Sequence, residues 1–176
     1  DKIGRYSAGQ VMVYRRDQAI MIVDMGGGYG GPLYEHLKAN FDSDPNRVLP
    51  LVHGFKGSEA SIKRTSDGLL SFKNKRTEAL WKMREALDPG QVGGSQIMLP
   101  DDPELVADLT APTFEIVGTV IVAESKEDVC ERLGRSTDKG DTVCMAWTQG
   151  PIASTDSAIW DEVRKEMGRN SRMGGR

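Results

Sequence analysis

The chain has 176 residues, of which 38% are hydrophobic and 28% are charged, and its formal net charge is −3. This length fits one globular domain with a core of its own, and so small a net charge argues neither for nor against a polyanionic partner. No apolar run approaches the roughly 18 residues of a membrane span, and no signal peptide opens the sequence, so we expect neither a membrane protein nor a secreted one.

Apolar segments alternate with helical patterns along the chain, and this predicts a mixed α/β domain. We expect strands over residues 7–14, 20–24 and 48–52, a short helix over 32–39 and a loop over 54–71. We further expect helices over 74–87, from 101, over 125–133 and over 141–147, with a β-hairpin of 114–117 and 119–123 that turns at Gly118. Residues 1–157 should form the domain, and residues 158–176 a C-terminal helix with a basic, flexible tail.

The stretch from Ile20 to Tyr34 carries the strongest functional indication. An apolar strand runs into Asp24, then into a glycine loop, then into a helical pattern that enters through Pro32. Ligands of open α/β sheets gather at the carboxyl ends of strands, so Asp24 is placed where chemistry usually occurs.

One interpretation of the glycine loop, residues 26–31, is a phosphate site in a nucleotide-binding or non-catalytic α/β module. Gly26, Gly28 and Gly31 give the pattern G-x-G-x-x-G, which is weak by itself. Asp24 stands two residues before the first glycine and would repel a phosphate. No clear strand-ending acid follows about 20 residues later to take a ribose, and no P-loop motif is present. This module remains the alternative hypothesis.

The other interpretation makes Asp24 a metal ligand, because Mg²⁺ and Mn²⁺ prefer carboxylate oxygens. Asp138 and Asp141 lie three residues apart at an expected helix start, so both side chains can share one face. The same acids could simply favour the positive end of the helix. Cys130 and Cys144 lack the spacing of metal ligands and are expected to be buried, reduced thiols in an intracellular protein.

Three motifs in order resemble the nuclease domain of tailed-phage terminase large subunits. They are the run from Val23 to Gly30, the run from Phe72 to Trp81, and the acidic stretch that begins at Glu124 and continues through Arg132 to Asp141. The resemblance covers roughly residues 20–147. It implies an RNase H-like mixed β-sheet flanked by helices, and a Mg²⁺- or Mn²⁺-dependent endonuclease, with two ions, that cuts concatemeric double-stranded DNA during genome packaging.

Residue by residue, Asp24 matches the acid that ends the strand before the glycine loop, Asp141 the last acid, and Asp138 a neighbouring polar position that assists the metal. Asp1 is the candidate in this chain for the first acid of the family. This chain departs from the pattern Ser-Pro-Asp-x-Ala-Asp-Ala, with Thr137 for the proline and with Gly140 and Thr142 for the alanines. These changes keep both acids but predict a looser helix start.

Basic side chains near these motifs are candidates for DNA contacts: Lys73, Lys75, Arg76, Lys126, Arg132 and Arg135. Such contacts would position a duplex without reading its sequence. Trp81, Trp147 and Trp160 are expected in the core or at an interface rather than stacked on bases.

The resemblance also implies the setting in which the domain works. The partners would be double-stranded DNA, a terminase ATPase domain outside this chain, the portal protein and the small terminase subunit. The location would be the host cell cytoplasm.

Overall fold

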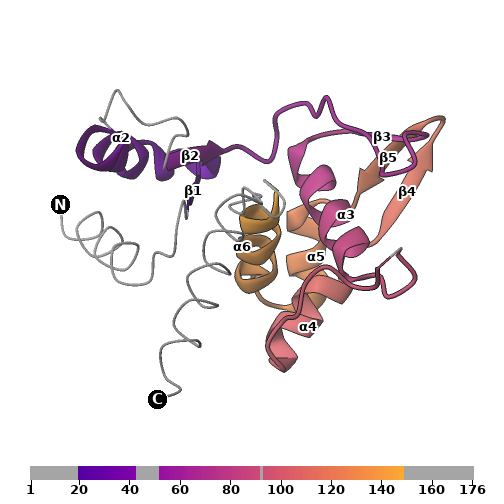
Figure 1. Ribbon diagram of the computed structural model, residues 1–176. Helices are drawn as coiled ribbons and strands as arrows, with labels where there is room; N and C mark the ends of the chain where they lie inside the picture. The colour runs from indigo at the N-terminus through magenta and orange to yellow at the C-terminus, as the bar shows by residue number, and fades with distance from the viewer. Residues whose placement is uncertain (1–19, 43–51, 92, 149–176) are drawn as a thin grey trace, which may run out of the picture.

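The computed structural model describes residues 20–42, 52–91 and 93–148 (Figure 1). The elements in chain order are β1 (Met21–Asp24), η1 (Gly26–Gly28), α2 (Gly30–Phe41), β2 (Val52–Phe55), β3 (Ser71–Phe72), α3 (Lys75–Leu87), α4 (Pro103–Thr110), β4 (Phe114–Val117), β5 (Val120–Ala123), α5 (Lys126–Leu133) and α6 (Asp138–Trp147). The expected strand over 7–14, the expected helix over 158–167 and the domain boundary after 157 lie outside the described residues.

Parallel and antiparallel pairing both occur, and the mixed α/β architecture is confirmed. β1 pairs with β2 in parallel, with Met21 opposite Val52 and Asp24 opposite Phe55. β5 lies between β3, its parallel neighbour, and β4, its antiparallel hairpin partner. Within the described part of the chain, these strands form two separate sheets, one of two strands and one of three.

Helix α6 joins the two halves of the structure. It contacts β1, α3 and α4, and Figure 1 shows it between the β1–β2 ladder and α3. One core cluster forms where α2 packs on β1 and β2, around Val23, Leu37 and Val52. The second forms between α3 and α6, around Met83 and Cys144. Among the described residues, no helix is both long and apolar enough to cross a bilayer.

The expected helix ends have clear local causes. The Asn74 side chain accepts the Thr77 N–H (2.9 Å) at the start of α3, and Ser125 accepts the Asp128 N–H (3.1 Å) at the start of α5. Helix α5 ends at Gly134, whose φ of 69° is a left-handed conformation that suits glycine. The expected hairpin, the helix after residue 101 and the helix over 74–87 are likewise confirmed.

Several expected boundaries were wrong, and one of them is the start of the helix expected over 141–147, which begins at Asp138. The strand expected over 48–52 continues as β2 through Gly54 to Phe55, because pairing with β1 fixes that register, whereas residues 48–51 lie outside the described residues. Gly54 pairs with Val23 within the strand, and a glycine suits this position since a Cβ there would meet the Met25 side chain at 3.1 Å. The loop expected over 54–71 therefore begins later and ends in β3, and α2 begins at Gly30 rather than at residue 32.

Candidate active site

A pocket of about 540 Å³ lies where β1, β2, α3, α5 and α6 converge. Its lining includes Asp24 from the end of β1 and Asp141 from α6, 117 positions apart in the sequence. Lys73, Arg76 and Lys126 line the same pocket. Tertiary packing therefore brings two of the predicted acids and three of the predicted bases to one cavity.

Asp24 is exposed at the carboxyl end of β1, and its Oδ1 atom accepts the Gly26 N–H at 2.8 Å. Gly27 and Gly28 follow with φ values of 64° and 80°, which other residues rarely adopt. A Cβ at Gly30 would lie 1.8 Å from the Asp24 carbonyl oxygen, so α2 can begin this close to β1 only through a glycine. The loop thus holds Asp24, and a carboxylate already accepts one of the N–H groups that the phosphate alternative would need.

Asp141 is half-buried in the first turns of α6, and three side chains surround its carboxylate. The Thr137 hydroxyl donates to Oδ2 at 3.0 Å, and the Lys126 ammonium lies 2.8 Å from the same oxygen. Arg76 Nε lies 3.9 Å from Oδ1. An acid surrounded by donors is kept in one orientation.

Asp138 lies one turn earlier, at the rim rather than in the lining. Its side chain is 78% exposed and accepts from Ser136 Oγ at 2.6 Å, and Lys126 Nζ is 3.2 Å away. These two contacts hold the pKa of Asp138 below its usual value. Burial lowers the pKa of Lys126, but the hydrogen bonds and charges of Asp141 and Asp138 outweigh it, so the net pKa is raised and the ammonium stays charged.

Arg76 is mostly buried and incompletely paired. Its Nη1 donates to the Glu124 carbonyl oxygen, whereas Nε and Nη2 are buried without a hydrogen-bond partner among the described residues. Unsatisfied buried donors are costly. A guanidinium in this state is suited to an anionic group that enters the pocket.

The remaining predicted bases do not line the pocket and form ion pairs with acidic side chains. Lys75 pairs with Glu59, Arg132 with Glu124, and Arg135 with Asp108 and Glu104. Arg132 also donates to the Ala111 carbonyl oxygen at 2.7 Å. These three side chains tie elements of the fold together.

The donor set is compatible with a hard divalent ion, although it is incomplete. Asp24 and Asp141 supply carboxylate oxygens to one cavity, which is the ligand type that Mg²⁺ and Mn²⁺ prefer. Within residues 20–42, 52–91 and 93–148, no group of three or more His, Cys, Asp or Glu side chains is arranged to hold a metal. Asp1, the candidate for the first acid, lies outside the described residues.

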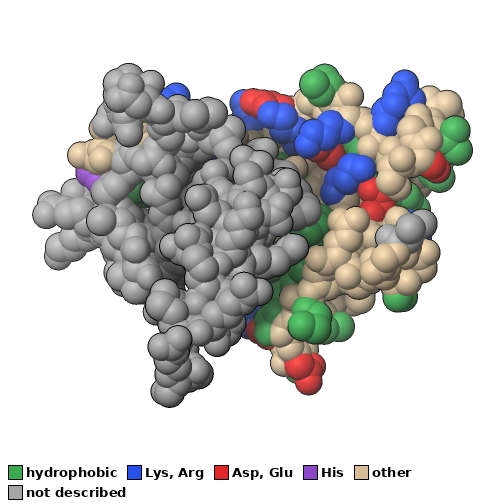
Figure 2. Space-filling view, in the orientation of Figure 1, with side chains coloured by type: hydrophobic (Ala, Val, Ile, Leu, Met, Phe, Trp, Pro, Cys, Tyr) green, Lys and Arg blue, Asp and Glu red, His purple; other side chains and the backbone are tan. Residues whose placement is uncertain are grey.

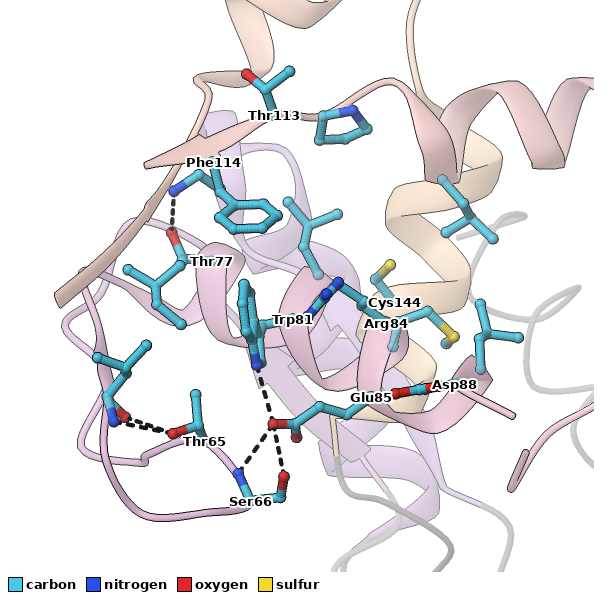
Figure 3. A pocket seen from close by; sticks show the side chains of 18 of the residues that line it. Thr65, Ser66, Thr77, Trp81, Arg84, Glu85, Asp88, Thr113, Phe114 and Cys144 are labelled. Atoms are coloured by element: carbon cyan, nitrogen blue, oxygen red, sulfur yellow. Dashed lines mark hydrogen bonds between the residues drawn. The ribbon is translucent and has the colours of Figure 1, made fainter. Parts of the chain in front are cut away.

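A second pocket, of about 630 Å³, lies along α3 and is shown in Figure 3. Trp81 meets Phe114 edge to face with ring centroids 4.8 Å apart, and its Nε1 donates to Glu85 at 3.0 Å. Trp147 packs against the core between α3 and α6, whereas Trp160 lies outside the described residues.

Cys144 borders both pockets and is buried. Burial raises the pKa of its thiol to about 12, and the nearby charge of Asp141 adds to this effect. Cys130 is only partly buried.

Thr137 and Asp108 lie outside the pocket lining but contact the start of α6, which carries Asp141, and the sequence did not reveal either contact. In the sequence, Thr137 stands out only as a departure from the family pattern, and a hydroxyl in place of proline beside an acid is the signal that could identify it. Asp108 gave no such signal, because its relation to α6 exists only in three dimensions.

No protein-family model matches the sequence, and no curated protein matches it. In three dimensions the chain is similar to the nuclease domain of the large terminase subunit gp2 of bacterial virus Sf6. The TM-score is 0.54 at 18% sequence identity, covering 81% of this chain and 70% of that chain. Two structures of a mutant of that domain, one with manganese and one with calcium, give TM-scores of 0.55 and 0.56 at the same identity and coverage. The chain therefore has the fold of these nuclease domains, which is the RNase H-like fold expected from its motifs.

Proposed function

We propose that this chain is the metal-dependent endonuclease domain of a viral DNA-packaging terminase large subunit. The observation that carries the proposal is the convergence of Asp24 and Asp141 on a pocket that Lys73, Arg76 and Lys126 also line. Acids for a cation beside bases for a polyanion are what phosphodiester hydrolysis requires. The similarity in fold to the Sf6 nuclease domain supports the same assignment.

Asp24 and Asp141 would hold the divalent ions, with Asp1 as the proposed first acid and Asp138 as an assisting group at the rim. We propose two ions, either Mg²⁺ or Mn²⁺. Bound there, they would supply an activated water and stabilise the leaving oxygen. The manganese and calcium of the Sf6 structures support the choice of a divalent ion.

The chain's own residues orient these groups and the substrate. Gly26 fixes the Asp24 carboxylate through its N–H, and Lys126 lies against Asp141 where it offsets negative charge. Arg76 would offer the phosphodiester two donors that have no hydrogen-bond partner among the described residues, and Lys73 is an exposed residue of the pocket lining. We assign Lys75, Arg132 and Arg135 to the ion pairs that they form rather than to direct contacts with the scissile phosphate.

The partners belong to the same proposal. They are double-stranded DNA, the ATPase domain of the motor, the portal protein and the small terminase subunit, with the host cytoplasm as the location.

The test is cleavage of supercoiled plasmid by the full chain with Mn²⁺, with Mg²⁺ and with EDTA. We expect nicking and linearisation that require the metal and that Asp24→Asn abolishes without unfolding the protein. Asp101→Asn, which removes an exposed carboxylate outside the pocket lining, is the matched control and should cut like the wild type. Cleavage that persists in Asp24→Asn, or a folded wild type that cuts nothing with either metal, would contradict the proposal.

A further inference from the structure

The first turn of α6 is supported in an unusual way. The helix begins at Asp138 after Thr137, yet the Thr137 side chain makes no capping hydrogen bond to the helix N–H groups. The N–H groups of a first turn need partners, and a threonine at this position normally supplies one. The support must therefore come from elsewhere.

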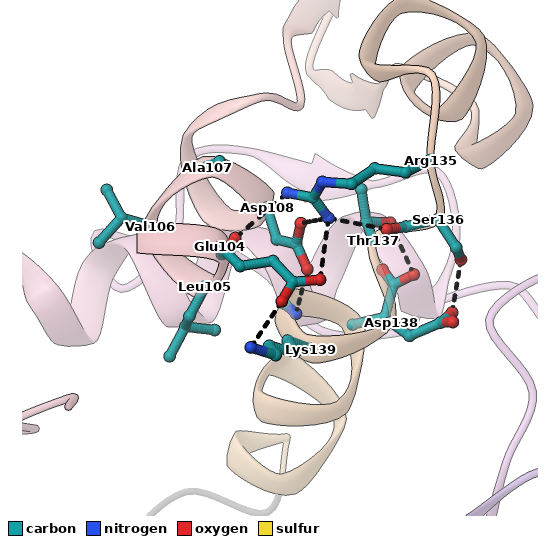
Figure 4. A network of polar contacts seen from close by, with 12 residues as sticks. Glu104, Leu105, Val106, Ala107, Asp108, Arg135, Ser136, Thr137, Asp138 and Lys139 are labelled. Atoms are coloured by element: carbon teal, nitrogen blue, oxygen red, sulfur yellow. Dashed lines mark hydrogen bonds and ion pairs between the residues drawn. The ribbon is translucent and has the colours of Figure 1, made fainter. Parts of the chain in front are cut away.

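Asp108 of α4 supplies this missing cap. Its side chain is fully buried, and Oδ2 accepts the Gly140 N–H at 3.0 Å, which is the bond that a capping side chain would usually make. Arg135 forms an ion pair with the other carboxylate oxygen, and Figure 4 shows the Asp108 and Arg135 side chains pointing toward each other. The cap thus comes from a neighbouring helix.

Gly140 makes this approach possible. A Cβ at position 140 would lie 2.6 Å from the Asp108 Cβ and 3.2 Å from its carbonyl carbon. Contacts this short do not occur without movement of one helix. The glycine that replaces the usual alanine therefore lets α4 come close enough for Asp108 to reach the helix start.

Because Asp108 caps the helix, the Thr137 hydroxyl can donate to Asp141 instead of capping the helix. Its hydroxyl donates to Asp141 Oδ2 at 3.0 Å, and the residue is only 2% exposed, so water does not compete for the bond. A proline at position 137 has no hydroxyl and could not make this contact. Both departures from the family pattern thus have a part in one arrangement, and the helix start, which we expected to be looser, has two side-chain contacts.

We propose that Thr137 and Asp108 are positioning residues for Asp141, an inference that rests on the proposed nuclease function. Thr137 sets the rotation of the Asp141 carboxylate, and Asp108 fixes the backbone of the turn that carries it. Hydrogen-bond partners of a metal ligand commonly control metal affinity by about 10- to 100-fold.

The experiment compares Thr137→Val with Thr137→Ser in the full chain, with Mn²⁺ as the probe. Valine keeps the shape but removes the hydroxyl, whereas serine keeps the hydroxyl. We expect Thr137→Val to weaken Mn²⁺ binding, followed by the electron paramagnetic resonance signal of the free ion, by about 10-fold. Thr137→Ser should bind nearly as the wild type does. Plasmid cleavage should show a lower kcat with an unchanged KM for DNA, because Thr137 does not line the pocket.

Asp108 provides a second, independent pair of variants. Asp108→Asn keeps an oxygen that can accept the Gly140 N–H and should bind Mn²⁺ more tightly than Asp108→Ala. Lys139→Ala is the matched control, because it breaks the exposed pairs with Asp102 and Glu104 in the same region without touching the helix cap. If Thr137→Val does not fold, as judged by urea unfolding, this pair carries the same test.

The outcomes separate the inference from the function on which it rests. A wild type that binds no Mn²⁺ overturns both. A wild type that binds Mn²⁺, with folded Thr137→Val and Asp108→Ala proteins that bind it equally well, overturns the inference alone. Equal weakening by Thr137→Val and Thr137→Ser also overturns it, since packing rather than the hydroxyl would then be responsible.

Discussion

Glu124 shows how strongly one side chain can be held at the edge of the candidate site. Its carboxylate accepts from Arg132 Nη2 at 2.7 Å and from both the N–H and the hydroxyl of Thr113 at 3.0 Å. The Arg132 hydrogen bond is the largest of the effects that lower the pKa of Glu124 from 4.5 to about 2. The Glu124 carbonyl oxygen also accepts from Arg76, so this residue links a side chain of the pocket lining to Thr113, directly before β4.

This arrangement predicts a defined pH dependence of the free energy of unfolding. A carboxyl whose pKa is depressed in the folded state stabilises the protein fully above its ordinary pKa, and the effect is lost as the pH falls through the folded value. The difference in unfolding free energy between the wild type and Glu124→Gln should be constant above about pH 4.5. It should shrink toward zero as the pH falls to about 2. Urea unfolding between pH 2 and pH 7 measures it, with Glu115→Gln, an exposed carboxylate on β4, as the control. A difference that stays constant down to pH 2 would contradict the assignment.

Among the elements, the junction of β1 with α2 depends on a single close approach. Helix α2 begins at Gly30, directly against the backbone of Asp24, so the strand end and the helix start form one unit. The neighbouring Gly31 has no atom within 4 Å of where a Cβ would stand. The two adjacent glycines therefore serve different purposes.

Replacing each of these glycines with alanine should change stability in opposite directions. Gly30→Ala places a Cβ 1.8 Å from the Asp24 carbonyl oxygen and should lower the free energy of unfolding by about 3 kcal/mol, the upper range for overpacking. Gly31→Ala occupies open space within a helix and should raise it by up to about 1 kcal/mol. Urea unfolding of both variants measures the effects. Equal destabilisation would mean that general loss of glycine flexibility, rather than the contact, matters.

For the molecule as a whole, the net charge of −3 requires that any attraction for DNA be local. Figure 2 shows Lys and Arg side chains gathered on the visible face in the region of α3 and the loop before it. Lys73 is exposed and lines the pocket, whereas Lys75 pairs with Glu59. Neighbouring lysines should therefore contribute unequally to binding.

The salt dependence of DNA binding tests this difference. Each phosphate neutralised adds about 0.9 to the slope of log K against log salt for double-stranded DNA. In EDTA, which prevents cleavage, Lys73→Ala should reduce the slope by about this amount, and Lys75→Ala should change it little. Fluorescence anisotropy of a labelled duplex measures both. The opposite order of effects would place the DNA path away from the pocket.

Local sequence accounts well for the elements whose causes are local. Asn74, Ser125 and Gly134 act within a few residues of the helix ends that they define, so α3 and α5 could be located in advance. The extension of β2 through Gly54 to Phe55 could not, because pairing with β1 places that glycine inside a strand. The predictions for α3 and α5, which depend on contacts between residues close in the sequence, were confirmed, whereas the one for β2, which depends on contacts between distant segments, was not.

By itself, the sequence determined the α/β class, the end of β1 at Asp24 and the helix starts whose capping residues it contains. Only the tertiary structure decided that Asp24 and Asp141 line one pocket and that Arg76 lies there with donors that have no hydrogen-bond partner among the described residues. It also decided that Arg132 and Arg135 form ion pairs. It also decided the parts of Thr137 and Asp108 around α6. The physical reason is distance along the chain: hydrogen bonds and charges act over a few ångströms, and which distant residues come that close is set by how β1, α3, α4 and α6 pack.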